Sequence, residues 1–124
     1  MLIKIYIFII KLSLYFPYFP FCGKIRIGGN MKIGVIKEIK SGENRVGMTP
    51  NNVSELVKAG HTVLFQEDAG IGAGFSNEEY LKAGGILSTQ DETWDVELLV
   101  KVKEPLESEY KYFKQDLIIW GFLH

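Results

Sequence analysis

The sequence predicts an α/β fold built on a doubly wound parallel sheet, and three observations carry that prediction. Short apolar, β-branched runs alternate with short segments that begin with helix caps. The composition, 47% hydrophobic and 23% charged, is that of an ordinary globular protein. The length, 124 residues, suits one domain better than two.

The first half of the predicted sheet lies between residues 32 and 66. Residues 32–37 are apolar and β-branched, which predicts a buried strand. After a polar loop, Thr49 and Pro50 form a helix start, with threonine as the cap and proline in the first turn. Gly60 is placed to end that helix in the left-handed conformation, and Thr62–Gln66 form the next strand.

The second half alternates in the same way. Ser76 and Glu79 have the spacing of a capping box, and the helix that they begin ends at Gly84. The remaining predicted elements are a brief strand at Ile86-Leu87, a short helix at Asp91–Trp94, a strand at Glu97–Val102, a helix at Ser108–Phe113 and a strand at Leu117–Phe122. Because no helix follows the last strand, we expect an incomplete sheet whose apolar run 117–122 and one edge are exposed.

Residues 1–30 differ from the rest of the chain. They carry four basic residues and no acid (+4), whereas residues 31–124 carry the other ten basic and all fifteen acidic residues (−5). A secretory signal would need small residues where 15–21 are bulky, and a membrane-spanning helix would need about 20 apolar residues without Lys11 and Pro17. We expect a hydrophobic extension, from a start site assigned upstream of Met31, or else a membrane-associating tail, followed by a domain over 31–124.

Composition also narrows the classes of function. A formal net charge of −1 argues against a sequence-independent nucleic-acid binder, which needs a basic surface. The single cysteine, Cys22, excludes a disulfide framework, and two histidines leave little room for a metal site. We therefore expect neither a nucleic-acid partner nor a bound metal.

A glycine-rich stretch, Gly70 to Gly74, follows a strand and precedes a helix, and Asp91 lies about 20 residues further on, as in a dinucleotide-binding motif. That motif needs its third glycine three residues after the second, inside the opening turn of the helix. Here Gly74 comes two residues after Gly72, and the helix begins afresh at Ser76. The stretch is expected to be a turn, and no cofactor-binding residue is predicted.

Several other conspicuous side chains have ordinary structural explanations. His61 is expected on the surface beside a helix end, and Trp94 and Trp120 in the core. The acid pair Glu78-Glu79 suits a helix start, where negative charge is favourable. None of them is predicted to be catalytic.

Three residues form a better candidate site. Arg45 lies in the loop after the first strand, Lys103 follows the Glu97–Val102 strand, and His124 follows the last strand. Ligands of open parallel sheets bind at the carboxyl ends of the strands, so the three side chains are expected to converge. Arginine grips a carboxylate with two bonds and histidine moves a proton near neutral pH, which together suit a small carboxylic acid. Lys101, on the same strand face as Lys103, is an alternative ligand.

At these positions residues 31–124 closely resemble the amino-terminal part of bacterial alanine dehydrogenase. The segments that carry the resemblance are Met31–Val35 with Lys37-Glu38, Glu43–Pro50, Gly60–Val63, Ala69–Gly74, Leu98–Pro105 and Phe122–His124. The Arg-Val-x-x-Thr-Pro pattern at Arg45–Pro50 is shared with the transhydrogenase alpha subunit, whereas Lys-Val-Lys-Glu-Pro and Phe-Leu-His favour alanine dehydrogenase.

The resemblance implies a Rossmann-like substrate domain from a cytoplasmic, homo-oligomeric oxidoreductase that uses NAD to deaminate L-alanine to pyruvate and ammonia. It implies substrate binding by Arg45 and Lys103 and acid–base catalysis by His124. It also implies that the NAD-binding domain is not in this chain, so that the chain alone is expected to be inactive. A transhydrogenase fragment and a stand-alone, non-catalytic module are the alternatives.

Overall fold

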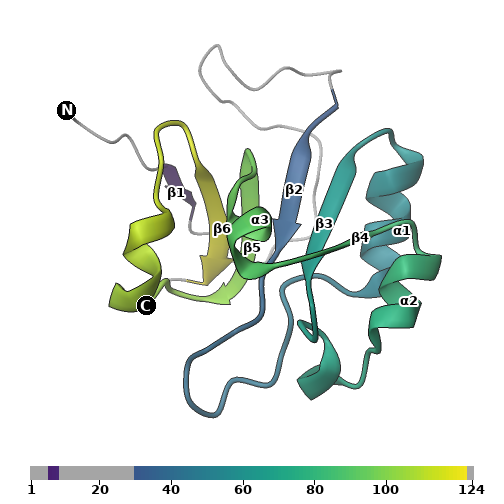
Figure 1. The fold of residues 1–124 in the computed structure, drawn as a ribbon, viewed down its shortest axis with the longest axis horizontal. Coiled ribbons are helices and arrows are strands. Elements are labelled where there is room, and N and C mark those ends of the chain that lie inside the picture. The colour runs from purple at the N-terminus through teal and green to yellow at the C-terminus, as the bar shows by residue number, and fades with distance from the viewer. Residues whose placement is uncertain (1–5, 9–29, 123–124) are drawn as a thin grey trace.

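The computed structural model describes residues 6–8 and 30–122, and in these residues six parallel strands form one sheet (Figure 1). The strands are β1 (Tyr6–Phe8), β2 (Lys32–Val35), β3 (Thr62–Gln66), β4 (Ile86–Ser88), β5 (Leu98–Lys103) and β6 (Ile118–Phe122). Their order across the sheet is β1-β6-β5-β2-β3-β4. The α-helices are α1 (Pro50–Lys58), α2 (Asn77–Lys82) and α3 (Gln90–Trp94), and two 3-10 helices are η1 (Ile71–Ala73) and η2 (Glu107–Tyr112).

Both faces of the sheet are covered, which confirms the doubly wound prediction. On one face, Val53 of α1 and Tyr80 of α2 pack with side chains of β2, β3 and β5. On the other face, Trp94 of α3 packs with Leu99 and Ile119, and Tyr112 of η2 adds to that cluster. Figure 1 shows α1 and α2 together beside β3 and β4, with α3 in front of the sheet.

Local capping explains why the α-helices begin where the sequence predicts. Thr49, Ser76 and Thr89 each accept a hydrogen bond from the backbone N–H three residues later, in three capping boxes. Gly60 and Gly84 follow α1 and α2 with φ of 96° and 94°, the left-handed conformation that glycine adopts without strain. The segment predicted as a helix at 108–113 is instead the 3-10 helix η2.

The prediction that the last strand exposes its apolar run is wrong. Leu117 and Ile119 are fully buried, because Trp94, Tyr112 and Phe113 fold over that face of the sheet. Ile118 and Trp120 are half-buried. The edge of β6 is also paired, since β1 runs parallel to it in the register Tyr6 to Ile118.

Residues 1–30 therefore contribute one strand among the described residues. The expectation of an extension or tail falls largely on residues 1–5 and 9–29, which lie outside the part that the structure describes, and so does Cys22. In the described ranges, no helix is both long enough and apolar enough to cross a bilayer.

The strand order places a switch point between β2 and β5. From β2 the chain moves outward to β3 and β4, and it then returns to the other side of β2 for β5 and β6. The segment after β2 leads to α1 on one face, and the segment after β5 leads to η2, beside the cluster on the opposite face. The loops diverge there, and a crevice at the carboxyl ends of β2 and β5 is the expected ligand site of such a sheet.

Candidate functional site

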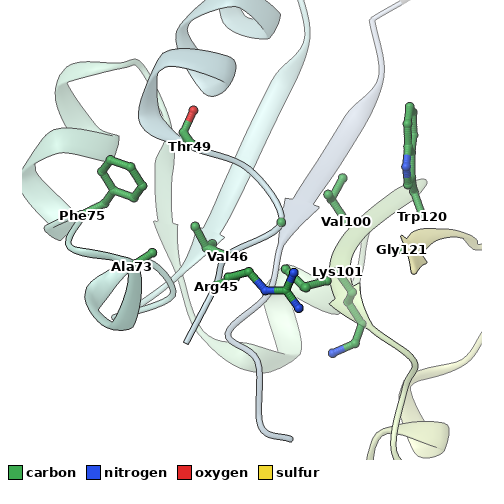
Figure 2. A pocket seen from close by; sticks show the side chains of 11 residues that line it. Arg45, Val46, Thr49, Ala73, Phe75, Val100, Lys101, Trp120 and Gly121 are labelled. Atoms are coloured by element: carbon green, nitrogen blue, oxygen red, sulfur yellow. The ribbon is translucent and has the colours of Figure 1, made fainter. Parts of the chain in front are cut away.

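A cavity of about 340 Å³ lies at this switch point (Figure 2). One wall is formed by the loop after β2, with Arg45, Gly47 and Thr49, and by Phe75 after η1. The opposite wall is formed by the ends of β5 and β6, from Val100 to Val102 and at Trp120 and Gly121. The cavity is therefore mostly apolar, with a guanidinium group at its edge, which is a common composition of small-molecule sites.

Arg45 is held by a neighbouring carboxylate. Its Nε donates to Oε1 of Glu43 at 2.9 Å and its Nη2 donates to Oε2 at 2.7 Å. The Arg45 side chain is 65% exposed, whereas that of Glu43 is 6% exposed. Arg45 holds the pKa of the Glu43 carboxyl at about 2. Since Glu43 uses the Nε edge of the guanidinium, the edge formed by Nη1 and Nη2 faces away from it and suits a second carboxylate.

Lys103 brings a second positive charge to the same place. It is half-buried at the end of β5, and its charge, after that of Arg45, helps to lower the pKa of Glu43. It also helps to lower the pKa of Glu104, for which Lys40 is the main cause. Lys103 is not among the residues that line the cavity, so its convergence with Arg45 on a substrate stays a prediction.

Lys101, the alternative ligand, has other partners. Its side chain is buried, and its Nζ lies 2.8 Å from Oε2 of Glu38 and 3.1 Å from Oε1 of Glu109. Both carboxylates are buried as well. A buried ammonium that is paired twice costs free energy to release, so Lys101 is poorly suited to bind a ligand that must come and go.

Sequence reasoning gave no role to Glu38 or Glu109. Their signal is Lys101 itself, which interrupts the apolar run of β5 at a buried position. A lysine in a strand covered on both faces needs a buried acid, because unpaired charges are almost never buried. Glu38 is a candidate for this buried acid, because it follows β2, the strand that pairs with β5.

His124 lies outside the described residues, so its predicted place beside Arg45 and Lys103 stays a prediction. His61 is half-buried, and its Nδ1 accepts a hydrogen bond from the Met31 N–H at 3.1 Å, where a surface position was expected. Of the two tryptophans, Trp94 is 1% exposed, in the core as predicted, whereas Trp120 is half-buried and lines the cavity.

The glycine-rich stretch is a turn, as predicted. Its centre is η1, and Gly74 has a φ of 90°. A Cβ on Gly72 would lie 2.9 Å from the backbone oxygen of Asn44, so this glycine lets the Arg45 loop pack closely against the turn. That space is filled by the chain itself, and the turn does not fit the diphosphate of a dinucleotide. Nor do the described residues contain three His, Cys, Asp or Glu side chains grouped to hold a metal.

Comparison with known proteins gives consistent matches. A sequence profile described as "Alanine dehydrogenase/PNT, N-terminal domain" matches residues 34–124. "Alanine dehydrogenase 1" of Staphylococcus aureus strain Mu50 is 54% identical over 94 residues, which are 76% of this chain and 25% of that protein. A solved structure titled "L-alanine dehydrogenase" has a TM-score of 0.75 at 47% identity, covering 76% of this chain and 26% of that one. The chain thus spans about a quarter of the length of these relatives.

A transhydrogenase from Sinorhizobium meliloti is also similar in structure. Its crystal structure gives a TM-score of 0.70 at 24% identity and covers 73% of this chain. Identity at that level shows a shared fold alone. The 54% identity to the staphylococcal protein therefore favours the alanine dehydrogenase branch of the family over the transhydrogenase branch.

Proposed function

The chain belongs to the alanine dehydrogenase/PNT N-terminal domain family, and from this we propose that it forms the substrate-binding part of an alanine dehydrogenase. The proposed enzyme is a cytoplasmic oligomer that oxidatively deaminates L-alanine to pyruvate and ammonia with NAD. The observation that carries the proposal is the mostly apolar cavity at the switch point, with the Arg45 guanidinium at its edge.

Arg45 is proposed to bind the carboxylate shared by alanine and pyruvate. Glu43 holds the guanidinium along its Nε edge, which supports an arrangement in which the substrate carboxylate binds along the Nη1–Nη2 edge. Lys103 would bind the same carboxylate or the carbonyl oxygen of pyruvate. The apolar side of the cavity, including Val46 and Phe75, would contact the methyl group.

His124 is proposed as the group that moves a proton as the imine forms and breaks down. A histidine changes its charge near neutral pH and serves commonly as a general acid and base. Since the described residues offer no cradle for a dinucleotide, no residue of this chain is assigned to NAD.

The experiment that tests the proposal is a chimera. Residues 31–124 would replace the matching quarter of Staphylococcus aureus alanine dehydrogenase 1, and amination of pyruvate would be followed by the loss of NADH absorbance. We expect an active chimera in which Arg45→Ala raises the KM for pyruvate by about 30-fold or more, since truncating one partner of such a charge pair costs about 2–5 kcal/mol. Arg45→Lys should rescue little, because lysine lacks the planar fork.

His124→Ala should act differently in the same chimera. It should lower kcat by about 10²–10⁴, the usual contribution of general acid–base catalysis. The KM for pyruvate should change less than kcat does. An active chimera whose kcat is unchanged by His124→Ala would reject the assignment of this histidine. A chimera in which Arg45→Ala leaves the KM unchanged would reject the carboxylate site.

A further inference from the structure

Two lysines lie at the carboxyl end of β5, and their environments differ. Lys101 and Lys103 are two residues apart, a spacing that places side chains on the same face of a regular strand. Yet Lys101 is 3% exposed and paired with Glu38 and Glu109, whereas Lys103 is half-buried. The difference between the two lysines has two causes, and both lie at the carboxyl end of β5.

The first part of the explanation is an irregularity in the strand. Val100 pairs with Trp120, and the next pair is Lys103 with Phe122, so three steps along β5 match two steps along β6. Such a bulge interrupts the ladder and changes the direction of the side chains that follow it. At the bulge Gly121 lets β6 approach closely, since a Cβ there would lie 2.8 Å from the Lys101 carbonyl oxygen.

The second part is the carboxylate of Glu38, which binds the bulge at three points. Its Oε1 accepts hydrogen bonds from the backbone N–H of Val102 and, at 2.9 Å, from that of Lys103. Its Oε2 accepts from Nζ of Lys101 at 2.8 Å. The side chain is 2% exposed, and Glu38 comes from the loop after β2, so it spans the switch point from one wall to the other.

We propose that Glu38 is a positioning residue that fixes the bulge of β5 and keeps the Lys101 ammonium buried in an ion pair, so that Lys103 is the lysine left free to bind the substrate carboxylate. The identity of that carboxylate rests on the proposed function. The choice between the two lysines rests on the contacts of Glu38 and is independent of it.

The test compares the acetylation rates of the two lysines in the native, full chain. Acetic anhydride is added in trace amounts at constant pH, and fragment ions in mass spectrometry separate the two sites. We expect Lys103 to react at least about tenfold faster than Lys101, because a buried, ion-paired ammonium is costly to expose. Equal rates in the folded wild-type chain would overturn the proposal without any variant.

Two matched variants separate positioning from general stability. Glu38→Gln keeps the shape of the side chain but removes the charge, and Glu109→Gln does the same at the second partner of Lys101. Glu38→Gln should speed the acetylation of Lys101 by about tenfold or more and shift the amide proton signals of Val102 and Lys103. Glu109→Gln should leave those two amide signals in place. Unchanged amide signals in Glu38→Gln would overturn the assignment.

Pyruvate links the test to the proposed function. Saturating pyruvate should slow the acetylation of Lys103 in the wild-type chain and have little effect on Lys101. If the contrast between the lysines is present but pyruvate protects neither of them, the proposed function is wrong while the role of Glu38 in selecting Lys103 is supported.

Discussion

At the scale of single residues, the candidate site is organised by the buried carboxylate of Glu43, which pairs with Arg45. Glu43 receives two hydrogen bonds from the Arg45 guanidinium and one, at 2.9 Å, from the Arg45 backbone N–H. The three bonds fix both the loop and the direction of the guanidinium. An arginine fixed in this way loses less conformational entropy on binding a ligand than a free one would.

The ion pair predicts the titration of Glu43. Its folded-state pKa of about 2 lies below the ordinary value of 4.5, so its contribution to stability is present above pH 4.5 and is lost as the pH falls toward 2. We expect the Glu43 carboxyl carbon, followed by NMR in the wild-type chain, to titrate near pH 2, and at a higher pH in Arg45→Ala, which loses the guanidinium but keeps the backbone hydrogen bond. A wild-type midpoint above pH 4 would contradict the observed pairing.

His61 serves as a control residue, for which we expect a role in stability alone. Its Nδ1 accepts the Met31 N–H, at the point where Thr62 also donates its N–H to the Met31 carbonyl oxygen. His61→Ala should lower the free energy of unfolding by about 1 kcal/mol, the usual net value of one hydrogen bond. The measurement is urea unfolding of the full chain.

His61→Asn should restore part of that loss, because its side-chain oxygen can accept the same hydrogen bond. In the chimera, the kcat and KM for pyruvate should be unchanged by His61→Ala. A large loss of activity there would mean that His61, and not His124, is the catalytic histidine.

At the scale of elements, the predictable features are those that short segments determine by themselves. Thr49 before Pro50, and Ser76 with Glu79, cap their helices through contacts three residues apart, and the structure shows both caps where the sequence predicts them. The strand Thr62–Gln66 has the predicted bounds. Features set by distant contacts were not predictable, because no local pattern records them. Examples are the pairing of β1 with β6 and the bond from Glu38 to a strand 63 residues away.

The same distinction applies to the site. The sheet topology alone led to the expectation that Arg45 and Lys103 approach each other, because carboxyl ends of parallel strands share one edge. The choice between Lys101 and Lys103 depends on a bulge and on two buried acids, which come from three separate segments. Sequence spacing treats the two lysines as equivalent, and only their tertiary partners distinguish them.

The close contact between the glycine turn and the Arg45 loop gives a prediction at this scale. An alanine Cβ at position 72 would lie 2.9 Å from the Asn44 backbone oxygen, so the loop must shift. Gly72→Ala in the chimera should raise the KM for pyruvate by between about 10- and 100-fold, because small misplacements of a binding group are costly. Ile71→Ala, at an exposed position of the same turn, is the control and should have no effect. An unchanged KM in Gly72→Ala would show that the turn does not support the site.

At the scale of the whole molecule, one sheet supplies both walls of the cavity. The loop after β2 and the end of β5 meet across the switch point, and two ion pairs join them, Glu38 with Lys101 and Lys40 with Glu104. The deeper pair is buried and holds the strand, whereas the outer pair is half-exposed and, like most such pairs, adds little stability. These two pairs tie one wall of the cavity to the other.

The glycine turn borders the cavity through Ala73, but at Gly72 it is packed against the chain itself. The cavity at the switch point is bordered by Arg45, while the glycine turn that resembles a phosphate loop is packed against Asn44. We expect the full chain to show no saturable binding of NADH in the micromolar range, followed as heat or as nucleotide fluorescence. Pyruvate, titrated under the same conditions, should perturb the NMR signals of Arg45 in the wild-type chain but give no saturable shifts in Arg45→Ala. Saturable NADH binding in the micromolar range would mean that the turn at Gly70–Gly74 is a dinucleotide site after all.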